Sequence, residues 1–284
     1  MLLREALRKG LQALAEHHIP SSELAAELLL MHALGCERGY LHAHMEESLS
    51  DETTRRYFAL VAERLTGKPT QYITGHQEFW GLDFEVTPDV LIPRPETEHV
   101  VEAVLKFARG EGAPRLVDVG TGSGCIALAL AWELPTASIF AADISPAALG
   151  VAQRNAARLG LEKRVEFRES DLLAYFLDRD ERGSFDLILS NPPYVAQNEL
   201  DHVQREVKQF EPRLAWGGLR NGDEVYRRLF PQAQQLLKPG GRVVVEIGYL
   251  LRDAVVSLLR SDWAEIVVWP DLNGIPRVVT AQKV

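Results

Sequence analysis

The first 70 residues repeat apolar positions with the period of an α-helix. Leucines carry the first stripe, at Leu3, Leu7, Leu11 and Leu14. Residues three and four apart lie on one face of a helix. A second stripe runs over 24–29 behind Ser21 and Ser22, a pattern typical of a helix start with a serine cap. With a third helix expected over 51–65, this part of the chain predicts a small all-helical domain.

The pattern changes between residues 76 and 87, where apolar and polar residues alternate around Gly81 as in a β-hairpin. A proline-restricted loop, 91–98, follows and carries a capping signal for the next helix. From Arg115 onward, short apolar strands alternate with helical segments. The expected strands cover 116–119, 138–142, 165–168, 185–190, 242–247, 265–269 and 276–281. Such alternation predicts an α/β fold with a largely parallel sheet.

Composition and charge narrow the possible functions. The chain has 284 residues and a net charge of −9, with a pI of about 5.5. Tight, non-specific binding to duplex DNA depends on Lys and Arg that neutralise phosphates. We therefore expect no direct nucleic-acid binding.

The cysteines and the apolar segments give further expectations. Cys36 and Cys125 form neither a disulfide framework nor a metal-binding spacing, so no metal is expected. The first ten residues lack the apolar core of a signal peptide. The most apolar stretch, 24–34, is too short to span a bilayer. These features predict a cytoplasmic protein that makes no use of a membrane.

A glycine-rich turn at 120–124 joins the first strand of the α/β part to a helix. Glycines allow positive φ and a close approach of the backbone to a ligand, although a tight turn that binds nothing has the same composition. Asp143 ends the second strand, 19 residues after Gly124, where a carboxylate can accept both hydroxyls of a ribose. The alternative is a helix cap for the segment at Pro146, a role that Ser145 can fill instead. Together the two features indicate a ribosylated cofactor, as in NAD enzymes and S-adenosylmethionine (SAM) enzymes alike.

The most specific motif is Asn191-Pro192-Pro193-Tyr194, at the end of the fourth strand. Ligands of open α/β sheets bind at the carboxyl ends of the strands. Two consecutive prolines fix the backbone and remove two N–H donors, so carbonyl oxygens dominate there. An Asn oxygen beside a proline carbonyl suits an NH2 group that offers two hydrogens, and Tyr194 can lie against its flat face. A merely stiff loop would need neither Asn191 nor Tyr194.

A further loop segment, Glu211-Pro212-Arg213-Leu214, falls where the chain should leave the fourth strand for the next helix. Functional residues concentrate in such loops. A structural turn held by a salt bridge accounts for this segment equally well, so the sequence leaves both interpretations open.

These motifs together resemble the release-factor glutamine methyltransferases, the HemK/PrmC family. The resemblance covers nearly the whole chain. It is carried by residues 71–75, by 79–81 in the hairpin, and by 91–98, 118–127, 190–194, 211–214 and 271–277. It implies a class I SAM-dependent methyltransferase with a Rossmann-like α/β domain and a seven-stranded sheet at 91–284. A β-hairpin linker at 75–90 and a helical, substrate-docking domain at 1–74 would complete the chain.

The resemblance also implies the reaction and its residues. A methyl group would pass from SAM to the side-chain amide of the glutamine in the Gly-Gly-Gln motif of peptide chain release factors, giving N5-methylglutamine and S-adenosylhomocysteine. The cofactor would lie on Gly120, Thr121, Gly122, Ser123, Gly124, Asp143, Asp171, Leu172 and Asn191. The substrate would lie on Asn191, Pro192, Pro193 and Tyr194, with Asn191, Pro192 and Tyr194 as catalytic residues. Leu172 departs from the aromatic residue that the family often places near the adenine.

Two alternatives share part of this residue set. A nucleic-acid methyltransferase acting on an adenine or guanine amino group would also suit 191–194, because an exocyclic NH2 is planar and weakly nucleophilic. It would need base flipping on duplex DNA and a target-recognition domain, which the sequence does not show. An NAD oxidoreductase or a non-catalytic nucleotide-binding module would use the glycine turn and Asp143 but has no role for 191–194.

Overall fold

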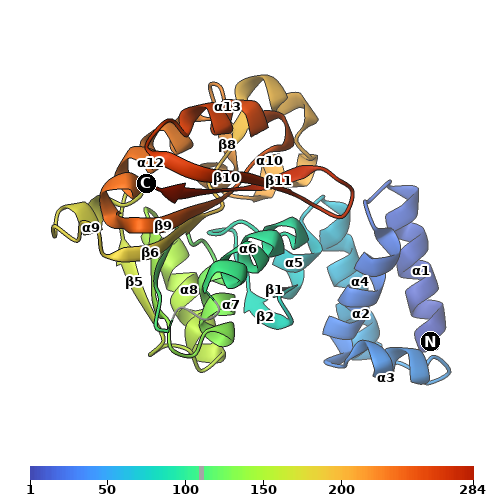
Figure 1. Cartoon of the computed structure of the whole chain (residues 1–284). Coiled ribbons are helices and arrows are strands. Elements are labelled where there is room, and N and C mark those ends of the chain that lie inside the picture. The colour runs from blue at the N-terminus through green and yellow to red at the C-terminus, as the bar shows by residue number, and fades with distance from the viewer. Residues whose placement is uncertain (109–111) are drawn as a thin grey trace. The chain divides into compact units, whose positions relative to one another are not determined.

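The internal contacts of the chain divide it into two units. The computed structural model describes residues 1–108 and 112–284, and Figure 1 shows their helices and strands. One unit comprises Met1–His76 with Gln204–Phe210, and the other Gln77–Val203 with Glu211–Val284. A short segment from the second half of the sequence therefore belongs to the N-terminal unit.

The N-terminal unit is helical, as predicted. Its helices are α1 (Leu3–Glu16), α2 (Ser22–Leu34), α3 (Arg38–Ala43), α4 (Asp51–Leu65), α5 (Thr70–Thr74) and α10 (Arg205–Phe210). Residues 71–74, part of the segment that carried the family resemblance, lie in α5. Gly75 ends α5 at φ +81°, a conformation that glycine adopts without strain.

The serine cap predicted for α2 is wrong. Ser21 has φ +50° and its side chain makes no capping hydrogen bond, because an N-cap side chain reaches the helix amides from an extended backbone. Ser22 is the first helical residue, and its hydroxyl donates to the carbonyl of Ile19. The apolar stripes are nevertheless buried, with Leu14, Leu29 and Leu30 fully inaccessible.

A buried ion pair joins α4 to α10 within the N-terminal unit. The side chain of Arg64 is 3% exposed, and its Nη2 lies 2.5 Å from Oε1 of Glu206. Its Nη1 donates to the carbonyl of Lys68 at 3.1 Å. A buried charge without a partner is strongly destabilising, so this pair ties the α10 segment to helices more than a hundred residues earlier in the sequence.

The second unit contains the predicted seven-stranded sheet. Its strands are β3 (Arg115–Val119), β4 (Ser138–Asp143), β5 (Val165–Glu169), β6 (Phe185–Ser190), β9 (Leu237–Glu246), β10 (Trp263–Pro270) and β11 (Pro276–Lys283). They run in the order β10-β11-β9-β6-β3-β4-β5. All neighbours pair in parallel except β11, which is antiparallel to β9 and β10. β9 begins at Leu237, five residues before the strand expected at 242–247, and its register against β6 shifts between Phe185 and Leu187.

Helices cover both faces of this sheet. Buried residues of α6 (Glu98–Ala108), α7 (Cys125–Glu133) and α8 (Pro146–Arg158) form one core with the hairpin. Those of α9 (Ala174–Leu177), α12 (Glu224–Leu236) and α13 (Arg252–Leu258) form the other. Leu116 belongs to the first core and Val117 to the second, because successive strand residues face opposite ways. The short elements are η1 (Pro95–Thr97), β7 (Val195–Ala196), η2 (Gln197–His202), α11 (Arg213–Trp216), β8 (Gly217–Leu219) and η3 (Tyr249–Leu251).

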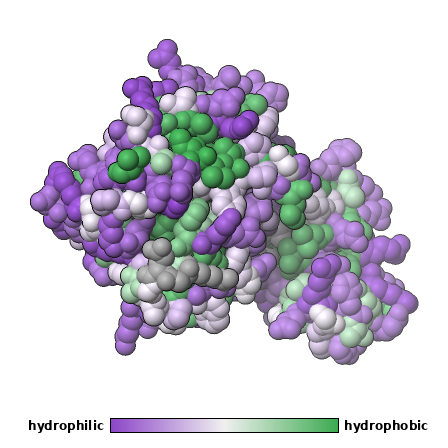
Figure 2. Space-filling model, viewed as in Figure 1, coloured by the Kyte–Doolittle hydropathy of each residue, from purple (hydrophilic) through white to green (hydrophobic). Residues whose placement is uncertain are grey.

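The edge strand β10 leaves apolar side chains at the surface. Ile266 and Val267 are 37% and 47% exposed. Figure 2 shows hydrophilic residues over most of the visible face, with a hydrophobic area where Figure 1 draws β10 and β11. The register of β10 is irregular between Ala264 and Val267. Such a bulge disturbs the row of unpaired backbone groups through which a regular edge strand pairs with another chain.

The hairpin β1 (His76–Phe79) and β2 (Leu82–Glu85) is anchored in the second unit. Phe79 and Phe84 are buried in the core that α6 and α7 share. Trp80 and Gly81 both have positive φ, as a tight hairpin turn requires. The hairpin is thus part of the core around the α/β sheet, although its sequence predicted a linker.

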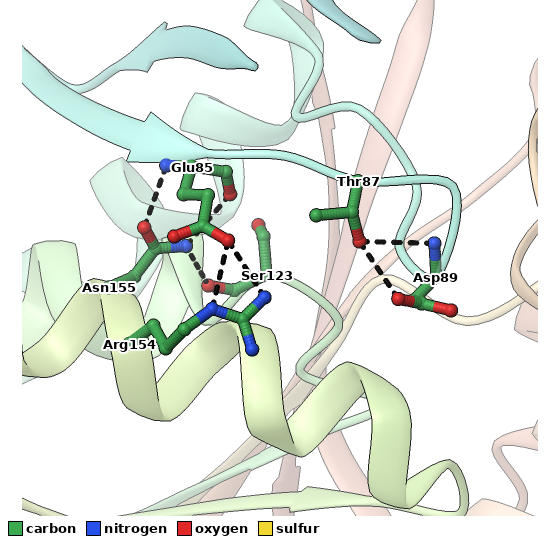
Figure 3. Close-up of polar contacts among 6 residues, drawn as sticks. All are labelled: Glu85, Thr87, Asp89, Ser123, Arg154 and Asn155. Atoms are coloured by element: carbon green, nitrogen blue, oxygen red, sulfur yellow. Dashed lines mark hydrogen bonds and ion pairs between the residues drawn. The ribbon is translucent and has the colours of Figure 1, made fainter.

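Asn155 of α8 bonds the end of the hairpin to the glycine turn (Figure 3). Its Oδ1 accepts from the amide of Glu85 at 2.7 Å, and its Nδ2 donates to the carbonyls of Glu85, at 3.0 Å, and Ser123, at 2.9 Å. Arg154 adds an ion pair to the Glu85 carboxylate. Asn155 is fully buried, so its side chain makes these hydrogen bonds to three backbone groups away from solvent.

We expect Asn155→Ala to lower the free energy of unfolding by about 1–3 kcal/mol, because it leaves buried backbone groups unpaired. Asn155→Asp should cost more, since it places a carboxylate oxygen against two carbonyls. Urea denaturation measures both effects. The control is Asn198→Ala at an exposed position, expected within about 0.5 kcal/mol of the unaltered chain. Equal stabilities for the Asn155→Ala and Asn198→Ala variants would contradict the assigned role.

Candidate active site

The glycine turn is shaped by bonds at the carboxyl ends of β3 and β4. The amides of Gly120 and Thr121 both donate to the carbonyl of Ala142, at 2.8 and 3.0 Å. The Thr121 hydroxyl donates to Oδ2 of the buried Asp118 at 2.7 Å. Gly124 has φ +83°, and a Cβ there would lie 3.1 Å from the Cβ of Ala152 on α8. The last glycine therefore serves the packing of two helices as well as the turn.

Asp143 at the end of β4 holds this turn directly. Its Oδ2 accepts from the amide of Gly122 and its Oδ1 from the amide of Ser145, each at 2.9 Å. The cap of α8 is made by the Ser145 hydroxyl, which accepts from the amide of Ala148, so Asp143 does not provide it. Burial raises the pKa of Asp143. A carboxylate has about four lone pairs, so acceptor capacity remains for a ligand.

One cavity brings most of the predicted site residues together. It is lined by Gly120, Thr121, Gly122, Ser123, Asp143, Asp171, Leu172, Asn191 and Pro193. Three other predicted residues are not among the described residues that line it. Gly124 packs against α8, Pro192 is buried, and the hydroxyl of Tyr194 donates to Glu246.

Asp171 and Leu172 approach the cavity from the loop after β5. The carboxylate of Asp171 pairs with Arg228 of α12 at 2.5 Å, and Arg228 lines the cavity as well. Leu172 has φ +53°, a conformation that few residues other than glycine adopt. The loop thus presents an aliphatic side chain to the cavity at the position where the family often has an aromatic ring.

Asn191 is held by a chain of side-chain hydrogen bonds. Its Nδ2 donates to Oγ1 of Thr97 at 3.0 Å, and Thr97 donates to Oε2 of Glu246 at 2.6 Å. The Tyr194 hydroxyl donates to Oε1 of the same carboxylate at 3.2 Å. Thr97 was expected only within a helix-capping signal. Its hydroxyl instead links the start of α6 to the ends of β6 and β9.

Two buried carboxylates lie behind the cavity. Asp118 is fully buried and Glu246 is 2% exposed. Burial raises the pKa of each to about 7, against the opposing effect of hydrogen bonds from Thr121 to Asp118 and from Thr97 and Tyr194 to Glu246. Burial also raises the pKa of the Cys125 thiol to about 12. Since the thiolate is the reactive form, Cys125 is a packing residue.

The segment at 211–214 has both of the roles that the sequence left open. Glu211 is buried, and it accepts from the Ile92 amide at 3.2 Å and from Arg94 at 2.5 Å. This salt bridge joins the proline-restricted loop to the chain before α11. Pro212 and Leu214 line the cavity, and Leu214 is 62% exposed. The carboxylate is structural, while its neighbours form part of the cavity wall.

Sequence reasoning gave no function to Thr97, Glu246 or Asn155. Thr97 lies in the 91–98 segment that carried the family resemblance. The sequence therefore marked this residue but did not indicate what its hydroxyl does. Glu246 closes an apolar strand, as Asp143 does, and a charged residue at that position marks the same edge of the sheet. Asn155 lies inside a helix, and its sequence gave no comparable signal.

The cavity offers hydrogen-bonding groups of several kinds. It is lined by the carboxylates of Asp89, Asp143 and Asp171, by Arg94 and Arg228, and by the amide of Asn191. Within residues 1–108 and 112–284, no three or more His, Cys, Asp or Glu side chains are grouped to hold a metal ion. Over the same residues, no helix is long and apolar enough to cross a membrane.

Two family models and one solved structure resemble this chain. Residues 5–75 match the family model described as the PrmC N-terminal domain, and residues 111–267 match a methyltransferase domain. Among solved structures, the hMettl16 catalytic domain in complex with MAT2A 3′UTR hairpin 6 is similar, with a TM-score of 0.57 and 20% identity over 79% of this chain and 81% of that one. At this identity the likeness supports the fold alone. Together with the two family models, it identifies the fold of a class I SAM-dependent methyltransferase with a helical N-terminal domain.

Full-length relatives are much more similar. The release factor glutamine methyltransferase of Koribacter versatilis is 51% identical over 283 residues, which cover 100% of this chain and 99% of that protein. The protein of the same name from Moorella thermoacetica is 44% identical over 286 residues, with the same shares covered. The chain belongs to the release factor glutamine methyltransferase family.

Proposed function

We propose that this protein transfers a methyl group from SAM to the side-chain amide nitrogen of glutamine in the Gly-Gly-Gln motif of peptide chain release factors. The products are N5-methylglutamine and S-adenosylhomocysteine. Relatives named for this activity match the whole chain. The observation that supports the proposal is that residues proposed for the cofactor and for the substrate amide, the glycine turn, Asp143 and Asn191, line one cavity.

The residues around the glycine turn fit SAM. Gly120 and Gly122 have positive φ, and a Cβ at either position would meet no heavy atom within 4 Å. The turn is therefore open, and the carboxylate of Asp143 retains acceptor capacity for ribose hydroxyls. Asp171 and Leu172 complete the proposed cofactor site. Bound SAM supplies a methyl group made electrophilic by a sulfonium.

The remaining task of the protein is to position a weak nucleophile. The lone pair of an amide nitrogen is delocalised into its carbonyl, so orientation matters more than acid–base catalysis. The Asn191 oxygen and the Pro192 carbonyl accept the two amide hydrogens, while Tyr194 lies against the flat face of the amide. As the new bond forms, the nitrogen becomes positive and these acceptors bind more strongly than in the ground state. The proton leaves after methyl transfer, and we assign no general base.

Residues 1–74 form the proposed docking domain for the protein substrate. They match the PrmC N-terminal domain, whereas the described groups of the cavity all lie in the second unit. A domain that supplies no group to the cavity is free to select the substrate by its surface.

Deleting residues 1–74 tests the docking role. We expect kcat/KM for intact release factor to fall at least tenfold, while methylation of a short Gly-Gly-Gln peptide and SAM binding change little, because only the intact protein reaches the docking surface. Circular dichroism checks that the shortened chain is folded, since α10 loses its packing partners. An equal loss on peptide and intact protein would show that the deletion acts on the active site instead.

Asp143→Asn tests the cofactor assignment. We expect the affinity for S-adenosylhomocysteine, measured by calorimetry, to fall about tenfold, the scale of one hydrogen bond to a charged group. A cofactor analogue without the two ribose hydroxyls should bind the variant and the unaltered protein equally. The control is Asp201→Asn at an exposed position. If the substitution weakens the binding of S-adenosylhomocysteine and of the analogue equally, Asp143 acts through the Gly122 amide and not through the ribose.

Asn191 tests the amide-binding mechanism. We expect Asn191→Ala to lower kcat by a factor on the order of 10²–10³, the scale of one preorganised polar contact, with SAM binding nearly intact. Asn191→Asp should retain partial activity, since it still accepts hydrogen bonds but adds charge beside the sulfonium. Steady-state kinetics with release factor measures both. A folded Asn191→Ala variant with near-native kcat would reduce the motif to a stiff loop.

A further inference from the structure

The hydrogen bonds behind Asn191 have a fixed direction. A Thr hydroxyl has one proton to donate, and its oxygen can accept. Thr97 donates that proton to Oε2 of Glu246 at 2.6 Å and accepts from Nδ2 of Asn191 at 3.0 Å. Above its pKa of about 7, Glu246 is ionised, and an ionised carboxylate can only accept. Glu246 therefore accepts the Thr97 proton, and the Thr97 oxygen is left to accept. Of the two ends of the Asn191 amide, only the NH2 end can donate to that oxygen.

Glu246 is itself held on both sides. Its second oxygen, Oε1, accepts from the Tyr194 hydroxyl at 3.2 Å, and its backbone carbonyl accepts from the Tyr226 hydroxyl at 2.7 Å. The side chain is 2% exposed and Thr97 is also 2% exposed, so water does not replace these partners freely. The Glu246 carboxylate, which sets the direction of these hydrogen bonds, is thus fixed in place before any substrate binds.

We propose that Glu246 and Thr97 are positioning residues that hold the Asn191 amide with its oxygen toward the substrate. The inference rests on the proposed function and adds residues to it. The two ends of an Asn amide have nearly the same shape, so packing alone discriminates poorly between them. With the NH2 end bound to Thr97, the oxygen is the end left for the cavity, where it accepts from a glutamine NH2.

The opposite orientation would oppose methyl transfer. It would present the Asn191 NH2 to the substrate NH2, two donors with no acceptor between them. The repulsion would grow in the transition state, because the substrate hydrogens become more positive as the bond to carbon forms. Glu246 and Thr97 therefore raise the rate without touching the substrate, by excluding an orientation in which Asn191 cannot act.

Threonine variants test this most directly. Thr97→Val keeps the shape and removes the hydroxyl, so the amide of Asn191 loses its fixed orientation. We expect kcat on a Gly-Gly-Gln peptide to fall about tenfold, the scale of one ordinary hydrogen bond. Thr97→Ser restores the hydroxyl and should recover kcat to within about threefold. The matched control is Thr280→Val, a fully buried threonine of β11 that accepts from Trp269. The same chemical change there should leave kcat within about twofold.

Glu246→Met tests whether the Glu246 carboxylate sets the direction of the hydrogen bonds to Thr97 and Asn191. The substitution leaves the hydroxyls of Thr97 and Tyr194 without their acceptor, which lowers stability, so thermal unfolding checks that the variant is folded. Without the carboxylate, the Thr97 proton turns to the Asn191 oxygen and the amide reverses. We expect kcat to fall on the order of 10²-fold, a larger loss than for Thr97→Val. The pH profile does not isolate Glu246, because burial raises the pKa of Asp118 to the same value of about 7.

A double substitution separates positioning from general disruption. In an Asn191→Ala background, Thr97→Val should lower kcat by less than about twofold, because the residue through which it acts is gone. Glu246→Met is left out of this test because it also removes the acceptor of the Tyr194 hydroxyl. A further loss in that background equal to the loss in the unaltered protein would overturn the proposal. So would equal kcat for the Thr97→Val and Thr97→Ser variants. If Glu246→Met does not fold, the threonine pair decides the question.

The unaltered protein is assayed first on the same peptide. No methylation of that peptide by the folded, SAM-binding protein would count against the proposed function itself. Full activity of the unaltered protein together with an unaffected, folded Thr97→Val variant would reject only the positioning role.

Discussion

The parallel register of four strands determines where the chemistry of this protein is located. Val119 of β3 pairs with Ala142 of β4 and with Ser190 of β6, and Ser190 pairs with Val245 of β9. The next residue on each strand is therefore Gly120, Asp143, Asn191 or Glu246. Because parallel strands end at the same edge, the cofactor turn, its carboxylate, the amide-binding Asn and the acid behind it share one row. The rest of the site is built around this row.

Supporting elements keep that row rigid from two directions. Asn155 bonds the glycine turn to the hairpin, and Thr97 bonds Asn191 to Glu246. The side chain of Asn155 is fully buried and that of Thr97 nearly so, and each hydrogen-bonds buried groups of other segments. Positioning catalysis depends on such second contacts, because a displacement of about 1 Å in the reacting groups can cost about 10²-fold in rate. The hairpin and the 91–98 loop are therefore parts of the active-site scaffold.

Sequence patterns predicted the fold well, and most of the residues they predicted for the site line one cavity. Apolar periodicity gave the helical unit and all seven strands, and the 191–194 motif directed attention to the end of β6. Long-range partners were not predictable in this way. Nothing local to Arg64 indicates Glu206, and nothing local to Thr97 indicates Asn191, since each pair forms only when distant segments pack. Ser21 was misassigned for a similar reason, because a composition signal for capping does not specify the backbone angle on which capping depends.

The central claim concerns the atom that receives the methyl group, and mass spectrometry addresses it directly. The purified protein is incubated with methyl-labelled SAM and equal amounts of release factor, duplex DNA and ribosomal RNA, and each product is sequenced. We expect the label on the side-chain amide nitrogen of the glutamine in Gly-Gly-Gln, and no label in either nucleic acid. A label on an adenine or guanine amino group, or on a different residue of the release factor, would contradict the account.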